Sequence, residues 1–246
     1  MRAILTYHSI DDSGSPISIS PAAFEGHLQW LVRGEVRPQS LDDILRPSTE
    51  SRDAVALTFD DGFVTSRRPI EQALDAGITP TLFVVTGHVG GTNAWGGRDQ
   101  AGIPTLPLMT WDELGHLVRK GLRIEAHSRT HPHLSRLSAA QLDDELGGCS
   151  EDLRSRLGLR STCVAYPYGD FDSRVANRAA NWFTSAVTTE MAPLDGRDEP
   201  MQSPRLDMYY YRTANGLQSW GSFAFRARLQ TIVMRRRVRA ALQPRP

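Results

Sequence analysis

The sequence predicts an α/β protein built on a parallel, barrel-like sheet within a single domain. Short apolar runs, such as residues 54–59 and 81–85, alternate with segments of helical periodicity. This alternation is typical of strand–helix–strand units, whose strands run parallel. The length of 246 residues is normal for one α/β barrel. A hydrophobic content of 40% is sufficient for a core of that size.

The first half of the chain predicts three strands and two helices. They are a strand over 3–7, a helix from Pro21 to the residue before Gly34, a strand over 54–59, a helix over 66–76 and a strand over 81–85. Ser20 is a suitable N-cap for the first helix, and proline is favoured at the first helical position. Residues 87–107 are rich in glycine and proline, which indicates a long loop.

The second half continues the same alternation. The predicted elements are a helix over 110–120, a strand over 122–126, a helix over 138–157, a strand over 162–166, a helix over 172–182 and final strands over 184–188 and 206–211. Thr110 and Glu113 form a capping box, which fixes the start of the first of these helices. Gly158 is suited to end the longest helix.

The charge is unevenly distributed, although the net charge is zero. Nine arginines and one acid lie from residue 205 onward, a net charge of +8. We therefore divide the chain into a barrel domain over 1–215 and a basic, arginine-rich helix or tail over 216–246. The segment 226–246 has seven arginines and no acid, so contact with an anionic membrane is one interpretation and a solvated helix is the other. Nucleic acid is not an expected partner, because no recognition motif accompanies the charge.

The N-terminal segment suggests a cytoplasmic protein. Its apolar part, residues 3–5, is too short for a signal peptide. The sequence also contains no apolar run long enough to cross a membrane.

Two motifs combine carboxylates and imidazoles at the ends of predicted strands. Asp60, Asp61 and Gly62 follow the strand 54–59, and His127 and His131 follow the strand 122–126. Carboxyl ends of parallel strands are where active sites assemble in α/β folds. One carboxylate and two histidines can hold a metal ion with room for water, and the second carboxylate can act as a base on that water. The motifs therefore predict metal-assisted hydrolysis.

A third motif follows the strand over 162–166. Pro167 and Gly169 favour a rigid turn around Tyr168. Such a turn can aim a backbone N–H at a developing oxyanion, although an ordinary strand-ending turn has the same composition.

Together these motifs resemble the polysaccharide deacetylase family (NodB-like, carbohydrate esterase family four). The matching segments are Thr58-Phe59-Asp60-Asp61-Gly62, His127-Ser128-Arg129-Thr130-His131 and Tyr166-Pro167-Tyr168-Gly169. The resemblance spans about residues 1–211 and implies a distorted (β/α) barrel that removes acetyl groups from N-acetylated sugars with the help of a metal ion.

The resemblance also implies a role for each site residue. Asp61, His127 and His131 would be the metal ligands, Asp60 the catalytic base, and the backbone N–H of Tyr168 an oxyanion donor. The ligand set favours zinc, with cobalt, manganese or nickel as alternatives.

The sequence departs from the family pattern at two points. The arginine that often orients the base is replaced by Ala165, and no tryptophan-containing motif with such an arginine is recognisable. The usual late Leu-x-His motif is missing, because no histidine follows His133. However, Tyr7-His8 resembles a branch that includes poly-N-acetylglucosamine deacetylases, in which a histidine of this pair is the acid. We therefore predict that His8 is the general acid.

The remaining histidines and tryptophans have less specific interpretations. His27 and His116 lie on predicted helices and are expected to be packing or surface residues, and His133 is expected to support the turn. Trp95 and Trp111 are candidates for lining a sugar cleft, although the helical position of Trp111 favours a core role.

Three alternatives remain open at this point. The first is a related hydrolase acting on a small non-peptide amide or ester, or on a lipid-linked sugar. The second is a non-catalytic relative that binds carbohydrate, and the third is a non-haem iron oxygenase, which also uses two histidines and a carboxylate. The sequence defines neither the sugar nor the oligomeric state.

Overall fold

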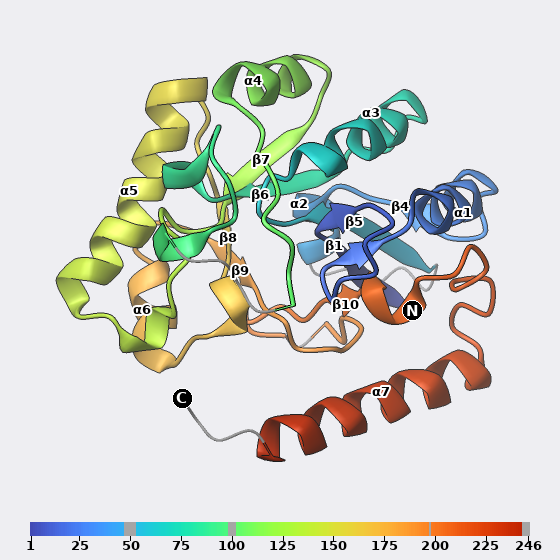
Figure 1. Ribbon diagram of the computed structural model, residues 1–246. Helices are drawn as coiled ribbons and strands as arrows, with labels where there is room; N and C mark the ends of the chain where they lie inside the picture. The colour runs from blue at the N-terminus through green and yellow to red at the C-terminus, as the bar shows by residue number, and fades with distance from the viewer. Residues whose placement is uncertain (47–52, 98–101, 197, 243–246) are drawn as a thin grey trace.

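The computed structural model describes residues 1–46, 53–97, 102–196 and 198–242, and its centre is a curled sheet of parallel strands with helices around it (Figure 1). The strand order is β10-β1-β5-β6-β7-β8-β9, with β4 beside β5. The bounds are Arg2–Tyr7 (β1), Arg37–Pro38 (β4), Ala54–Phe59 (β5), Thr81–Val84 (β6), Arg123–Ala126 (β7), Cys163–Ala165 (β8), Ser185–Val187 (β9) and Leu206–Asp207 (β10). The predicted α/β fold with a distorted, barrel-like parallel sheet is confirmed.

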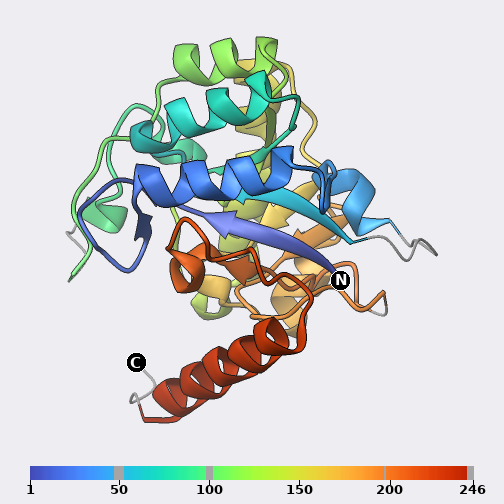
Figure 2. The same ribbon diagram turned by 90° about the vertical axis from the view of Figure 1, so that its right-hand side faces the viewer.

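Seven α-helices are present in the described part of the chain. They are Pro21–Val32 (α1), Leu41–Leu45 (α2), Arg67–Asp75 (α3), Trp111–Arg119 (α4), Ala139–Leu157 (α5), Ser173–Ala179 (α6) and Phe223–Leu242 (α7). The predicted caps are confirmed: the Ser20 side chain accepts from the Ala23 amide, and Thr110 forms a capping box with Glu113. Figure 2 shows α1, α3 and α4 side by side, and α7 at the opposite end of the molecule from α4.

Both faces of the sheet are buried, as expected for parallel strands covered on both sides. All six residues of β5 are buried, and alternate residues point to opposite faces. Leu57 packs in the larger core cluster with Leu5, whereas Ala56 packs in a second cluster with Ile4 and Phe83. The buried strands therefore provide a rigid base for the loops that follow their carboxyl ends.

The expected strand over 206–211 is wrong beyond its first two residues. Leu206 and Asp207 pair with β1, but Met208–Tyr211 forms a 3-10 helix. The side chain of Asp207 accepts a hydrogen bond from the Tyr209 amide, which turns the chain away from the sheet. The sequence analysis also missed the short elements β4 and α2, and a two-stranded sheet of Ser9–Ile10 (β2) with Ser18–Ile19 (β3).

The basic C-terminal segment contains the long helix α7, which packs against the barrel. Phe225, Leu229 and Ile232 are buried in the main core cluster. The Arg228 guanidinium donates to the Tyr210 carbonyl at 2.7 Å. In the described ranges, none of the helices is both long and apolar enough for a membrane span. The proposed boundary between residues 215 and 216 stays a prediction.

Candidate active site

The side chains predicted for the site meet at one rim of the sheet. Asp60 and Asp61 directly follow β5, His127 follows β7, and Tyr168 lies two residues beyond Tyr166 after β8. They surround a cavity of about 120 Å³, which is lined by His8, Ile17, Asp60, Asp61, Asn93, Trp95, Ile103, His127, His131, Tyr166, Tyr168 and Thr189. The structure therefore brings together every residue that the sequence singled out for catalysis or metal binding.

Backbone strain is concentrated in the three motifs. Among the described residues, four non-glycine residues have positive φ: Asp61 (71°), Ser128 (61°), His131 (61°) and Tyr168 (59°). This conformation is costly for residues other than glycine, and such strain typically gathers at functional sites. The turn after β5 begins at Asp61 itself, which lets two consecutive carboxylates face one site. His127 and His131 lie in a loop rather than on a helix, so the helical explanation of their spacing does not apply.

Asp61, His127 and His131 form a compact, buried group of potential metal ligands. Asp61 Oδ1 lies 3.4 Å from His127 Nε2 and 3.5 Å from His131 Nε2. Two donors at about 2.1 Å from one ion in tetrahedral geometry are about 3.4 Å apart, so these separations fit a zinc-type site. Asp61 Oδ1 is fully buried without a well-formed hydrogen bond, which a cation would satisfy. The residues therefore fit a divalent metal ion.

The protonation of the two imidazoles is compatible with metal binding. His127 Nδ1 lies 2.8 Å from the Ala165 carbonyl, an acceptor, so Nδ1 carries the proton and the Nε2 lone pair faces Asp61. Burial lowers the pKa of His131 to about 3, which keeps its ring neutral. Burial also opposes a charge on His127, but the negative charges of Asp60 and Asp61 outweigh it and raise its pKa overall. The same negative potential attracts a cation.

A buried glutamate from α5 holds the loop that carries His131. Glu145 Oε2 accepts hydrogen bonds from the backbone amides of Arg129 at 2.9 Å and Thr130 at 2.8 Å. Its Oε1 accepts from the Thr130 hydroxyl at 2.5 Å. The Ser128 hydroxyl accepts from the His131 amide at 3.0 Å, which closes the turn. Sequence reasoning missed Glu145, because its position inside a helix gives no local signal of this contact.

Asp60 is paired with a buried arginine that the sequence analysis did not identify. Arg205 Nη1 donates to Asp60 Oδ1 at 2.8 Å and Nη2 donates to Oδ2 at 2.7 Å, and both side chains are only 2–3% exposed. Arg205 Nε also donates to the Thr188 carbonyl at 3.0 Å. Burial alone would raise the pKa of Asp60, but the charge of Arg205 outweighs it and holds that pKa well below its ordinary value.

Arg205 makes the contact with Asp60 that was expected of the arginine missing at Ala165. From the sequence, Arg205 was noted only in the charge total from residue 205 onward, although it lies directly before β10. A single arginine that introduces a predicted buried strand is the signal that would have indicated its role, because such a charge needs a buried partner.

His8 and the surrounding aromatic residues complete the rim. His8 Nε2 lies 3.8 Å from Asp60 Oδ2, and its side chain is 25% exposed. The Trp95 ring stacks on His131 with centroids 4.6 Å apart, and the Tyr168 ring stacks on His133 at 4.4 Å.

His27 is buried, with Nε2 at 3.0 Å from the Tyr211 carbonyl and Nδ1 at 3.1 Å from the Tyr7 hydroxyl. It therefore anchors the strand that presents His8.

Comparison with known proteins places these features in one family. A family model described as polysaccharide deacetylase matches residues 48–186, more than half of the chain. The YxkH protein of Bacillus subtilis (strain 168), whose name assigns it provisionally to the polysaccharide deacetylases, is 24% identical over 193 residues. The match covers 76% of this chain but only 64% of the length of YxkH.

Solved structures of low sequence identity share the fold. The deacetylase PplD from Streptococcus pyogenes, in complex with acetate, superposes with a TM-score of 0.74 at 19% identity, over 88% of this chain and 96% of that chain. BC0361 from Bacillus cereus, a polysaccharide deacetylase, gives a TM-score of 0.71 at 21% identity, over 89% and 68% of the two chains. IcaB from Ammonifex degensii gives a TM-score of 0.69 at 21% identity, over 83% of this chain and 90% of that chain. With its motifs gathered at one rim of this fold, the chain belongs to the polysaccharide deacetylase family.

Proposed function

We propose that the protein is a metal-dependent hydrolase that removes N-acetyl groups from an N-acetylated sugar or polysaccharide. One observation carries this proposal: Asp60 is held ionised by Arg205 directly beside the buried Asp61, His127 and His131. A free carboxylate next to a three-donor cation site is the arrangement that amide hydrolysis by activated water requires.

Asp61, His127 and His131 would hold the divalent metal ion, for which zinc is the predicted identity. When bound, such an ion polarises a carbonyl and acidifies water at the site, which compensates for the weak basicity of a carboxylate whose pKa is lowered. The metal dependence, like the choice of metal, is part of the proposal.

The chain's own residues supply the proton transfers. Asp60 accepts the proton from the water whose oxygen attacks the acetamide carbon. The backbone N–H of Tyr168 is assigned to the developing oxyanion, because the turn that carries it lines the same cavity. His8 donates a proton to the departing nitrogen as the C–N bond breaks, and its partial exposure allows it to be reprotonated from solvent. The products are acetate and an amino sugar.

The comparisons and Arg205 favour this reaction over the alternatives. PplD is named a deacetylase and was solved with acetate, which would be a product of the proposed reaction. The case for a hydrolase of small amides or esters depended partly on a missing base-orienting arginine, and Arg205 fills that role. A cytoplasmic location stays a prediction.

An acetate-release assay tests the proposal. Purified protein is incubated with N-acetylated sugars in free, lipid-linked and polymeric form, before and after treatment with a chelator and after zinc is restored. We expect release that the chelator abolishes and zinc restores. Asp60→Asn should lower the rate by about 10²–10⁴-fold while the metal content stays unchanged.

Two outcomes would contradict the proposal. Acetate release that is insensitive to the chelator would exclude metal dependence, and full activity of Asp60→Asn would exclude the assigned base. Carbohydrate binding without acetate release from any substrate would instead support a non-catalytic relative.

A further inference from the structure

Helix α7 has two apolar faces, of which only one packs against the barrel. Phe225, Leu229 and Ile232 are spaced by four and three residues and are at most 9% exposed. Phe223, Met234 and Val238 lie on the opposite side of the helix at 100° per residue. Figures 1 and 2 show α7 at the edge of the molecule, so that one side of this helix has no other element of the chain against it.

The outward face, defined by Phe223, Met234 and Val238, exposes large apolar side chains to solvent. Their exposed fractions are 88%, 63% and 51%, and Phe223 is the most exposed large hydrophobic residue in the described part of the chain. Single exposed apolar residues are common, but several on one helical face indicate an interaction surface.

Basic side chains flank the outward face on both sides. By helical position, Arg226 and Arg237 lie on one flank and Arg235 on the other, while Arg239 lies between Arg235 and the packed face. The helix contains six arginines and no acidic residue. Apolar side chains bordered by cations are the pattern of a helix that lies in the interface of an anionic membrane. We propose that the outward face of α7 docks the protein onto a bilayer rich in anionic phospholipid.

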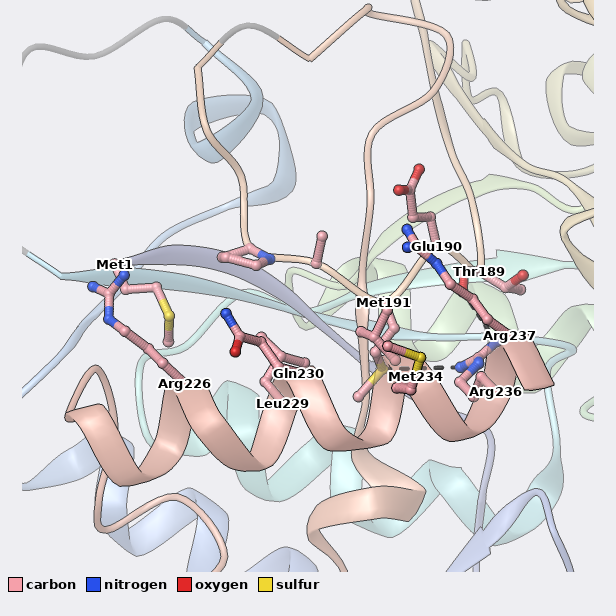
Figure 3. A pocket seen from close by; sticks show the side chains of 13 residues that line it. Met1, Thr189, Glu190, Met191, Arg226, Leu229, Gln230, Met234, Arg236 and Arg237 are labelled. Carbon is pink, nitrogen blue, oxygen red and sulfur yellow. Dashed lines mark hydrogen bonds between the residues drawn. The ribbon is translucent and has the colours of Figure 1, made fainter. Parts of the chain in front are cut away.

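An apolar groove continues the outward face on the side of Arg237. It has a volume of about 730 Å³ and lies between α7 and residues 189–193. Figure 3 shows Met191, Leu229 and Met234 along its middle, with Thr189 and Arg237 at one end. Met234 belongs both to this groove and to the outward face. The groove can therefore receive an acyl chain from a lipid whose head group pairs with the arginines.

The charge distribution favours a bilayer over a second copy of this chain. A symmetric contact through the outward face would bring the arginine flanks of two copies together, and like charges at close range are repulsive. An anionic lipid surface neutralises both flanks while it covers Phe223, Met234 and Val238. The proposal does not depend on the deacetylase reaction.

Vesicle co-sedimentation of the full chain tests the docking. The lipids are phosphatidylcholine alone or a mixture with phosphatidylglycerol. Two triple variants probe the two components: R235Q/R237Q/R239Q removes charge, and F223S/M234S/V238S removes apolar surface. The matched control, R46Q/R154Q/R174Q, replaces three arginines that are 73%, 69% and 45% exposed outside α7. Substitution is preferable to deleting the helix, which would uncover the core residue Phe225.

We expect the wild type and the control to bind the anionic vesicles and not the neutral ones. Each basic side chain near such a surface contributes about fivefold in affinity, so R235Q/R237Q/R239Q should lose roughly 100-fold. F223S/M234S/V238S should lose binding that persists at about 1 M salt, where charges are screened beyond about 3 Å. All variants should retain the wild-type melting temperature and acetate release from a soluble substrate.

Three results would overturn the docking proposal. They are equal binding of the wild type to neutral and anionic vesicles, a loss in the control as large as in R235Q/R237Q/R239Q, and sedimentation of the wild type as a dimer that F223S/M234S/V238S converts to monomer. If neither the wild type nor any variant releases acetate while vesicle binding follows the expected pattern, only the deacetylase proposal is contradicted.

Discussion

Replacement of Arg205 by alanine gives the sharpest test of how the site is built. The Asp60–Arg205 pair is bidentate and only 2–3% exposed, so the variant leaves a carboxylate buried without its cation. Breaking a buried pair on one side costs about 3–5 kcal/mol of unfolding free energy. For a chain of this length each kcal/mol lowers the melting temperature by about 2–4 °C, so we expect a decrease of roughly 6–20 °C.

The assay is thermal and urea unfolding of the wild type and Arg205→Ala, with Arg154→Ala as the matched control. Arg154 pairs with Glu151 on the surface, with exposed fractions of 69% and 57%, and such an exposed pair contributes little to stability. The loss of stability in Arg205→Lys should be smaller than in Arg205→Ala and larger than in Arg154→Ala. Lysine keeps the positive charge but cannot donate two parallel hydrogen bonds to one carboxylate. If Arg205→Ala and Arg154→Ala destabilise the protein equally, the reasoning from burial is wrong.

The loss of stability in Arg205→Ala should also depend on pH. In the wild type the pKa of Asp60 is lowered, so the pair contributes its full stability above the ordinary carboxyl pKa of about 4 and loses it as the pH falls further. In Arg205→Ala, burial without the guanidinium raises the pKa of Asp60, so the variant regains stability as the pH falls. The difference in unfolding free energy between the wild type and Arg205→Ala should therefore be largest at neutral pH and decrease toward pH 4. A difference that increases as the pH falls would contradict the pairing of Asp60 with Arg205 as the cause.

Three further substitutions probe other parts of the site. His8→Ala should lower the acetate-release rate by about 10²-fold with unchanged metal content, measured by atomic absorption, whereas loss of metal would show that His8 is misassigned. Glu145→Ala removes the acceptor of the Arg129 and Thr130 amides and should reduce metal retention by about 10–100-fold in chelator competition, because the loop that carries His131 is no longer held. Unchanged retention would show that Glu145 does not position this loop. Gly169→Ala would bring a Cβ to 2.0 Å from Thr189 Oγ1, at a position whose φ of 66° already disfavours alanine. This variant should lower the unfolding free energy, measured in urea, by at least about 1–2 kcal/mol. Wild-type stability would mean that the turn adjusts without cost.

The parts of the site that could be predicted from sequence are those set by local chain order. Asp60, Asp61 and His127 directly follow apolar strands, and parallel strands end at one edge, so their meeting required no knowledge of long-range contacts. The boundaries of α1 and α4 were equally local, because Ser20 and Thr110 cap helices within three residues of themselves.

The parts that escaped prediction depend on contacts between distant segments or on backbone strain. No residue near Glu145 in the sequence indicates that its side chain holds the loop of Thr130. Likewise, no residue near Arg205 indicates that its buried partner is Asp60. Positive φ at Asp61 is equally hidden, since a β-turn at Gly62 accounts for the sequence just as well. The strand expected over 206–211 failed for a related reason: the Asp207 side chain competes with the sheet for backbone hydrogen bonds.

The separation of Asp60 and Arg205 by 145 residues has a consequence for biosynthesis. A nascent chain that has emerged as far as β8 already contains Asp61, His127 and His131, yet the guanidinium that keeps Asp60 ionised has not been translated. Under the proposed mechanism, a polypeptide that ends before residue 205 lacks the guanidinium that holds Asp60 ionised, and it would be inactive. Only a chain whose synthesis has reached β10 contains every side chain that the proposed reaction uses.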